Sequence, residues 1–219
     1  SDKVWFTQAE IEALARDIDI TQFQDRPPTM TAVDLSVCDD FSSVAYTVYL
    51  ESLKSFHVHI DYYFPEEALR EHPNRELYQK WVNQGHLKLC KGKVIDYQMI
   101  VNDILSRNAH LSILGVGYDP YRSMEFVNLL AASGGKNVLQ PVRQTYGTFT
   151  SPVESFELAA KTGQVTFNNN PINWFCFGNA ILDEDRNENK KPIKRSKNEK
   201  IDGAITTLMT FYLFNNYEP

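Results

Sequence analysis

Hydrophobic side chains occupy the even positions of residues 56–64, and histidine, aspartate and tyrosine lie between them. A period of two residues is typical of a strand with one face in the core. Residues 31–37 and 42–50 are rich in β-branched and aromatic side chains, which predicts two earlier strands. Because two adjacent strands follow the first, we expect the three to form an antiparallel meander.

After residue 64 the hydrophobic spacing changes to the period of a helix. Helices are predicted over residues 65–83 with a break at Pro73, and over 96–107, 121–132, 150–161, 172–182 and 202–214. Extended segments are predicted over residues 88–94, 111–116, 138–142 and 165–167. The run 111–116 is wholly apolar, as expected for a buried parallel strand. This order predicts an α/β protein, with a ribonuclease H-like mixed β-sheet flanked by helices on both faces.

The chain divides near residue 30. Residues 8–17 have helical spacing, and the Asp-Arg-Pro-Pro sequence at 25–28 favours an extended connection. We therefore expect residues 1–30 to be an N-terminal linker or appendage and residues 31–219 to be one domain. Within that domain, the polar residues 183–199 predict a loop or hairpin.

Composition excludes several classes of protein. Apolar residues make up 42% and charged residues 23% of the chain, which is typical of a globular domain. The net charge of −6 excludes a wholly basic nucleic-acid coat, although not a local basic patch. No run approaches the roughly 18 apolar residues of a membrane span, and the N-terminus lacks a signal-peptide pattern, so we expect no membrane partner.

Three aspartates occupy positions where metal-dependent chemistry is expected. Asp34 lies between apolar residues of the first strand, where an unpaired acid costs free energy. Asp119 follows the apolar run 111–116, and ligand sites gather at the carboxyl ends of parallel strands. Asp202 opens the last helix. Alternatively, Asp34 is a solvated charge, Asp119 an ordinary turn residue and Asp202 a helix N-cap.

Two further acids are second-rank candidates. Asp40 lies just after the first strand, and Glu199 lies three residues before Asp202. For both, a solvated charge is the favoured interpretation. His57 and His59 share a strand face with Asp61, which is a possible metal face, although a half-exposed polar face is the preferred interpretation.

Carboxylates in this pattern indicate phosphodiester cleavage. Mg²⁺ and Mn²⁺ prefer oxygen ligands and keep coordination positions for substrate phosphate. Two such ions can activate a water molecule and stabilise the leaving oxygen. Asp34, Asp119 and Asp202 are therefore the predicted catalytic and metal-binding residues.

A basic stretch runs directly into Asp202. Residues 190–200 carry six basic groups and one acid, a charge of +5, so the other residues of the chain carry −6 − 5 = −11. Such a run is often only a solvated face. Beside a phosphate-cleaving site it would bind the DNA backbone without reading sequence. The predicted DNA-binding residues are Lys191, Lys194, Arg195, Lys197 and Lys200.

These motifs also carry a family resemblance over roughly residues 30–214. The matching stretches are Val33-Asp34-Leu35-Ser36 with Asp40, Tyr63-Phe64-Pro65-Glu66-Glu67, Trp81-Val82-Asn83-Gln84-Gly85, Gly92-Lys93-Val94-Ile95-Asp96, Tyr118-Asp119-Pro120-Tyr121, Ser151-Pro152 with Glu157, Asn170-Pro171 with Trp174 and Asn179, Lys191-Pro192 with Lys194, and Lys200-Ile201-Asp202-Gly203. In order and spacing they resemble the C-terminal nuclease domain of the terminase large subunit of tailed bacteriophages or prophages.

The resemblance implies a two-metal DNA endonuclease that cuts concatemeric viral DNA during genome packaging. The family's acidic triad would be Asp34, Asp119 and Asp202, and its cofactor Mg²⁺ or Mn²⁺, with two ions expected when DNA is bound. The implied partners are double-stranded DNA, an ATPase domain of the same polypeptide, the portal and the small terminase subunit. The implied location is the cytoplasm of the bacterial host.

Two other functions stay open at this point. One is a resolvase-like or integrase-like nuclease of the same fold, which would prefer branched DNA or join strands. The other is a catalytically silent module that binds DNA or docks within the packaging motor. The complete set of three acids favours the endonuclease over the silent module.

Overall fold

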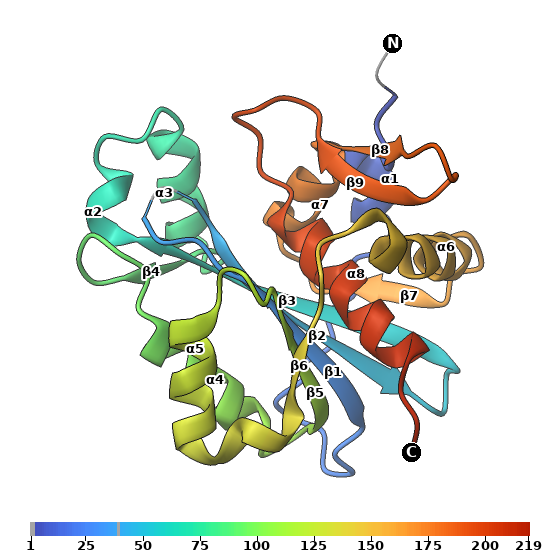
Figure 1. Cartoon of the computed structure of the whole chain (residues 1–219). Coiled ribbons are helices and arrows are strands. Elements are labelled where there is room, and N and C mark those ends of the chain that lie inside the picture. The colour runs from blue at the N-terminus through green and yellow to red at the C-terminus, as the bar shows by residue number, and fades with distance from the viewer. Residues whose placement is uncertain (1–2, 39) are drawn as a thin grey trace.

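The computed structural model of the chain describes residues 3–38 and 40–219, and its main feature is a mixed sheet with helices on both faces (Figure 1). The strands of this sheet are β1 (Pro28–Asp34), β2 (Ser42–Leu50), β3 (Ser55–Pro65), β4 (Lys88–Cys90), β5 (Ser112–Tyr118), β6 (Leu139–Pro141) and β7 (Val165–Phe167). Strands β8 (Ala180–Glu184) and β9 (Lys190–Lys194) form a separate hairpin. The helices are α1 (Gln8–Glu12), α2 (Glu66–Leu69), α3 (Arg75–Asn83), α4 (Tyr97–Arg107), α5 (Met124–Leu130), α6 (Tyr146–Lys161), α7 (Pro171–Gly178) and α8 (Asp202–Asn215), with a π-helical turn over Ala131–Gly135 and a 3-10 turn over Lys136–Val138.

The order of strands in the sheet is β4-β3-β2-β1-β5-β6, and β7 pairs with the other end of β3. Strand β2 is antiparallel to both β1 and β3, which confirms the predicted meander. Strand β5 runs parallel to β1, as its apolar sequence predicted, but only its second half is buried. The carboxyl ends of β1 and β5 therefore lie at the same edge of the sheet.

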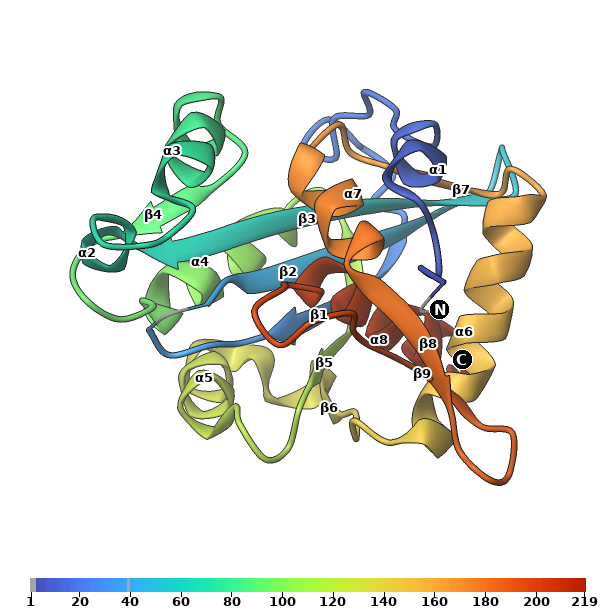
Figure 2. The ribbon, with the colours of Figure 1, turned by 90° about the horizontal axis from the view of Figure 1, so that it is seen from above.

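The two faces of the sheet form separate hydrophobic cores. On β3, the alternate residues Val58, Ile60 and Phe64 belong to the core beneath α6, α7 and α8, whereas Tyr63 belongs to the core beneath α4 and α5. The two groups of helices lie on opposite sides of the sheet (Figures 1 and 2). None of the helices in the described part of the chain is long and apolar enough to span a membrane.

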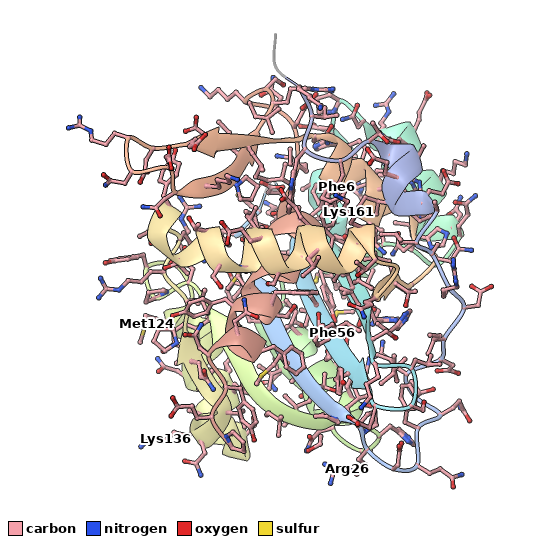
Figure 3. All side chains as sticks on the ribbon, turned by 90° about the vertical axis from the view of Figure 1, so that its right-hand side faces the viewer. Phe6, Arg26, Phe56, Met124, Lys136 and Lys161 are labelled. Atoms are coloured by element: carbon pink, nitrogen blue, oxygen red, sulfur yellow. The ribbon has the colours of Figure 1, made fainter. Side chains whose placement is uncertain are left out.

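Residues 3–30 pack closely on the rest of the domain. The Ile11 side chain is wholly buried, and the indole of Trp5 stacks on Phe177 and donates a hydrogen bond of 2.8 Å to Glu157. Helix α6 crosses this side of the molecule (Figure 3), and the Phe6 ring packs edge-on against Phe156 of α6, with 5.5 Å between the ring centroids. The domain boundary at residue 30 stays a prediction, but this segment contributes to the core and β1 already begins at Pro28.

Several predicted elements differ from the structure. Helix α1 ends at Glu12 rather than at residue 17, and β1 spans Pro28–Asp34 rather than residues 31–37. The apolar run 172–182 is not one helix, because α7 ends at Gly178 and β8 begins at Ala180. A continuous apolar run has no period that separates a buried helix from a buried strand. Helix α6 begins four residues before the predicted start, because Thr145 caps it, and the Thr150 hydroxyl donates to the Tyr146 carbonyl oxygen inside the helix.

The beginning of α8 fits closely against β3. The Tyr62 hydroxyl donates a hydrogen bond of 2.8 Å to the Asn173 Oδ1 atom of α7, and its oxygen lies against Gly203. A Cβ atom at Gly203 would overlap that oxygen. The glycine therefore allows α8 to begin directly over the buried tyrosine, and this contact sets the position of the neighbouring Asp202.

We predict that Gly203→Ala lowers the free energy of unfolding by about 1–3 kcal/mol, the usual cost of overpacking a core. Tyr62→Phe removes the clashing oxygen but leaves Asn173 without its donor, at a cost of about 1 kcal/mol. If the contact between Gly203 and Tyr62 causes the destabilisation, the double variant loses less free energy of unfolding than the two single variants lose together. Urea denaturation of all four proteins measures this coupling.

Gly147→Ala is the matched control, because a Cβ atom at this position in α6 meets nothing within 4 Å. We expect that variant to be as stable as the parent or slightly more stable, since alanine favours the helix. Equal destabilisation by Gly203→Ala in the parent protein and in the Tyr62→Phe variant would show that another contact is responsible.

Candidate functional site

A cavity of about 990 Å³ opens where β1 and β5 end beside the start of α8. Its lining includes four acidic and four basic residues. The charged lining residues are Asp34, Asp40, Asp119, Asp202, Arg122, Lys191, Lys194 and Lys200. The cavity thus contains the three aspartates that the sequence predicted together.

Three different elements place the three aspartates. Asp34 is the last residue of β1, and Asp119 directly follows β5. Because β1 and β5 are parallel neighbours, both acids emerge at the same edge of the sheet. Helix α8 packs across β1 and β2 and begins with Asp202 at this edge.

The local surroundings correct two of the sequence interpretations. Asp34 ends β1 rather than lying in its middle. Asp202 is the first residue of α8, whose N-cap is Ile201, so the N-cap alternative for this aspartate is wrong. Asp119 does act as a turn residue, since its Oδ1 atom accepts the Tyr121 backbone N–H at 2.9 Å, but it also lines the cavity.

Asp34 and Asp202 form a closely coupled pair. Their carboxyls lie close enough to form a hydrogen bond with each other when one of them carries a proton. Burial and the negative charges of Asp40 and Asp119 raise the pKa of Asp34 to about 7. A hydrogen bond with Asp202 and the positive charge of Arg122 act in the opposite direction but are weaker. Burial and the charge of Asp34 raise the pKa of Asp202 well above its ordinary value. The raised pKa of both carboxyls thus reflects burial and an excess of negative charge around this pair.

The donor atoms at this centre fit a hard divalent cation. The buried Oδ2 atom of Asp202 has no hydrogen-bond partner, and the nearby acids offer only oxygen ligands. Within residues 3–38 and 40–219, however, no three His, Cys, Asp or Glu side chains stand in a geometry that could hold a metal ion. Asp34 and Asp202 are instead paired with each other. Binding a cation therefore requires at least one of these carboxyls to turn.

The two second-rank acids differ in their positions. Asp40 lines the cavity, where its Oδ2 atom lies 3.3 Å from the Lys200 ammonium and 4.0 Å from that of Lys194. Glu199 does not line the cavity, and its Oε1 atom pairs with Arg195 at 2.8 Å. The structure thus brings Asp40, but not Glu199, to the three aspartates.

The basic residues also separate into two groups. Lys191, Lys194 and Lys200 line the cavity, whereas Arg195 and Lys197 are exposed outside it. Hairpin β8–β9 brings the first two to the site, which agrees with the predicted loop or hairpin. Arg122 was missed by the sequence reasoning because it lies far from the basic stretch. Its position three residues after Asp119 was the available signal.

The possible metal face on β3 is instead an ion-pair network. The Asp61 carboxylate pairs with Arg107 and His59, each at 3.0 Å, and lies 3.7 Å from Lys88. Burial by itself would raise the pKa of Asp61, but His59, Lys88 and Arg107 together hold it below its ordinary value. His57 and Asp61 are buried, so this face is not half exposed as expected.

Comparison with known proteins identifies relatives of this chain. The model of the family described as "Terminase large subunit, endonuclease domain" matches residues 2–218. Protein YmfN of Escherichia coli K12 is 27% identical over 207 residues, which cover 89% of this chain and 44% of that protein. The terminase large subunit of Enterobacteria phage HK97 is 25% identical over 151 residues, which cover 68% of this chain and 30% of that protein. The chain therefore spans less than half the length of these relatives.

Solved structures show the same fold. The large terminase of bacteriophage HK97 superposes with a TM-score of 0.84 at 20% identity, over 97% of this chain and 44% of that one. The large terminase nuclease of thermophilic phage G20c with bound magnesium has a TM-score of 0.62 at 10% identity, over 99% of this chain and 98% of that one. The ribonuclease H-like fold expected from the sequence is thereby confirmed.

The resemblance of the motifs, the shared fold and a family match that covers nearly the whole sequence agree with one another. This chain belongs to the family of terminase large-subunit endonuclease domains.

Proposed function

We propose that this chain is a divalent-cation-dependent DNA endonuclease. The observation that carries the proposal is the convergence of Asp34, Asp119 and Asp202 at one edge of the sheet, in a chain of the terminase endonuclease family. The coupled carboxyls of Asp34 and Asp202, with one buried oxygen left unpartnered, support a site for positive charge.

The three aspartates would be the ligands of Mg²⁺ or Mn²⁺, with two ions expected when DNA is bound. Such cations lower the pKa of water and stabilise the charge that develops on the leaving oxygen. Asp34 and Asp202 hold the oxygen donors at the centre, and Asp119 supplies another from the end of β5. Asp40 is a second-rank ligand from within the cavity, and Glu199 is a weaker candidate because it lies outside.

The basic residues at the cavity would hold double-stranded DNA. Lys191, Lys194 and Lys200 contact phosphates on one side of the acids, and Arg122 does so beside Asp119. Arg195 and Lys197 extend the same basic surface farther from the cut strand. We expect little readout of base sequence through hydrogen bonds, because the lysines that line the cavity lie on β9 and in the segment after it rather than on a groove-reading helix.

The biological role follows from the family. The domain would cut concatemeric viral DNA during genome packaging, in the cytoplasm of a bacterial host. An ATPase domain of the same polypeptide, the portal and the small terminase subunit would be its partners. These assignments concern the longer proteins that the chain matches over less than half of their length.

Plasmid nicking and linearisation test the activity. We expect cutting with Mg²⁺ or Mn²⁺, none with EDTA, and a loss of at least about 100-fold in the Asp119→Asn and Asp34→Ala variants, since each removes a ligand that the cation requires. Nick rates on supercoiled plasmid measure the effect, and circular dichroism verifies that the variants are folded.

Asp96→Asn is the control, because it makes the same aspartate-to-asparagine change at the N-cap of α4, where an asparagine can still cap the helix. We expect this variant to cut DNA as the parent protein does. Metal-dependent cutting that survives in folded Asp34→Ala would refute the assignment. A parent that binds DNA but does not cut would indicate the silent module, and preference for four-way junctions over linear DNA would indicate a resolvase.

Metal binding should also stabilise the domain. A cation at 100 times its dissociation constant adds about 2.7 kcal/mol, so we expect Mn²⁺ to raise the melting temperature by several degrees. The rise should be larger at pH 8 than at pH 5, because at pH 5 the raised pKa of Asp34, about 7, keeps a proton that competes with the cation. The Asp34→Asn variant should not show the rise in melting temperature with Mn²⁺. Thermal melts with Mn²⁺ and EDTA measure this, and an unchanged melting temperature would count against the site.

Two lysines three residues apart test the DNA surface. Lys194 lines the cavity and Lys197 lies outside it, although both side chains are exposed. We expect Lys194→Ala to weaken DNA binding and to reduce the salt slope, log Kd against log salt, by about one. Lys197→Ala should change both the DNA affinity and the salt slope less. Fluorescence anisotropy across a salt series with the Asp34→Asn protein measures both, and equal effects would contradict the division into two groups.

A further inference from the structure

Lys191, one of the lysines that line the cavity, stands opposite an acid in hairpin β8–β9. In the register of this antiparallel pair, Asp183 of β8 lies directly across from Lys191 of β9. Directly opposed side chains project from the same face of the ladder, and opposite charges in such a pair attract each other. An ion pair here would neutralise the lysine. Each of the two side chains instead has a different partner.

The partner of Asp183 is the first residue of α6. The Tyr146 hydroxyl donates a hydrogen bond of 2.5 Å to the Asp183 Oδ2 atom. Hydrogen bonds to a carboxylate are shorter and stronger than those between neutral groups. This hydrogen bond and the charge of Asp183 raise the pKa of Tyr146 above its ordinary value, so the hydroxyl keeps the proton that it donates. The carboxylate of Asp183 is thereby bound to α6.

The partners of Lys191 lie at the start of the same helix. Its ammonium donates a hydrogen bond of 2.7 Å to the Gln144 carbonyl oxygen and lies over the Tyr146 ring, 5.6 Å from the centroid. A cation in this position is attracted by the face of the ring. Neither partner carries a charge, and the carbonyl uses one of the three N–H groups of the ammonium. Because Gln144 also lines the cavity, Lys191 is held there with its charge and two donors available for a phosphate.

A further contact fixes the hairpin to the start of α6. The Thr150 hydroxyl accepts the Lys190 backbone N–H at 2.8 Å and donates to the Tyr146 carbonyl oxygen at 2.8 Å. The hairpin and the first turns of α6 lie side by side (Figures 2 and 3). The backbone next to Lys191 and the backbone of Tyr146 are therefore held at a fixed separation, within which only the side chains choose their partners.

We propose that Tyr146 is a positioning residue, which keeps Lys191 available for a DNA phosphate by holding Asp183 away from it. The inference rests on the proposed endonuclease function and specifies how one phosphate contact is maintained. The hydroxyl binds the carboxylate, while the ring and the Gln144 carbonyl hold the ammonium at the cavity. Without the hydroxyl, Asp183 loses its donor and pairs with the lysine opposite, which neutralises Lys191 and draws it from the cavity.

The effect of Tyr146 on DNA binding is thus indirect and passes through Asp183. Tyr146 does not itself line the cavity, so removal of its hydroxyl deletes no group from the site. The dependence of binding on salt reports the change, because each lysine that binds a phosphate contributes about one to the slope of log Kd against log salt.

The first experiment measures DNA binding in the Asp34→Asn protein by fluorescence anisotropy across a salt series. Lys191→Ala should weaken binding to a short duplex about tenfold, as expected for the loss of one hydrogen bond between charged groups, and should lower the salt slope by about one. Tyr146→Phe should reproduce both changes although every basic residue is intact. Asp183→Asn added to Tyr146→Phe should restore both, because an amide cannot neutralise the ammonium.

Two controls accompany this series. Tyr63→Phe removes a hydroxyl that also donates to an aspartate, Asp103, at 2.5 Å, but Tyr63 belongs to the core beneath α4 and α5. That variant should bind DNA as the parent does. In the Lys191→Ala protein, Tyr146→Phe should have no further effect, because the lysine that it positions is absent. Circular dichroism verifies that each variant is folded.

The second experiment requires neither DNA nor catalysis. The face of an aromatic ring shields nearby protons, so we expect the ε-methylene signals of Lys191 to be shifted upfield in ¹H–¹³C NMR spectra of the unaltered protein. Tyr146→Phe retains the ring but should lose the shift as the lysine moves to Asp183, and Asp183→Asn should bring it back. Unshifted Lys191 signals in the unaltered protein would overturn the proposal without any variant.

These readouts separate the failure of the positioning role from the failure of the function. An unchanged salt slope in folded Tyr146→Phe, or no rescue by Asp183→Asn, overturns the positioning role and leaves the endonuclease intact. Absence of metal-dependent cutting, with the slope and the rescue as expected, overturns the endonuclease but supports the positioning role. Failure of the protein to bind the duplex overturns the positioning role, because Lys191 then has no phosphate to contact.

Discussion

The parallel pairing of β1 with β5 is the constraint on which the site depends. It brings Asp34 and Asp119, which are 85 positions apart in the sequence, to the same edge of the sheet. Helix α8 then has to begin over that edge, which it can do because Gly203 leaves room for the Tyr62 hydroxyl. The close approach of Asp202 to Asp34 follows from these two contacts. The raised pKa of each carboxyl is therefore a consequence of how the backbone packs.

Much of the fold was predictable because its strands carry clear patterns. The alternation over 56–64 predicted β3, and the apolar run 111–116 predicted a strand parallel to its neighbour. The run 172–182 was misread because an unbroken apolar sequence has no period to distinguish α7 from β8. The start of α6 was misplaced because Thr145 and Thr150 are both plausible caps, and only the hydrogen bonds of the folded chain distinguish them.

The sequence indicated which residues belong to the candidate site, but it did not indicate how they are arranged in space. Asp34, Asp119 and Asp202 lie within, after and at the start of strongly apolar segments, so they could be selected from the sequence. The separation of Lys194 from Lys197 could not be predicted from the sequence, because it depends on where hairpin β8–β9 ends relative to the cavity. Arg122 was missed because it lies far along the chain from the basic stretch. The histidines of β3 were hard to interpret, because their partners lie far along the chain: Arg107 of α4 contacts His59, and Thr166 of β7 contacts His57.

The first described residues pair with the hairpin that carries Lys191 and Lys194. Val4 forms a bridge to Ile181 of β8, and the Trp5 N–H donates to the Ala180 carbonyl oxygen at 2.9 Å, so these residues extend the hairpin by a further short strand. Strand β8 in turn pairs with the residues of β9 that include Lys191 and Lys194. Residues 4–5, β8 and β9 are therefore three adjacent backbone segments, so the position of the two cavity lysines on β9 depends in part on where the first described residues attach to β8.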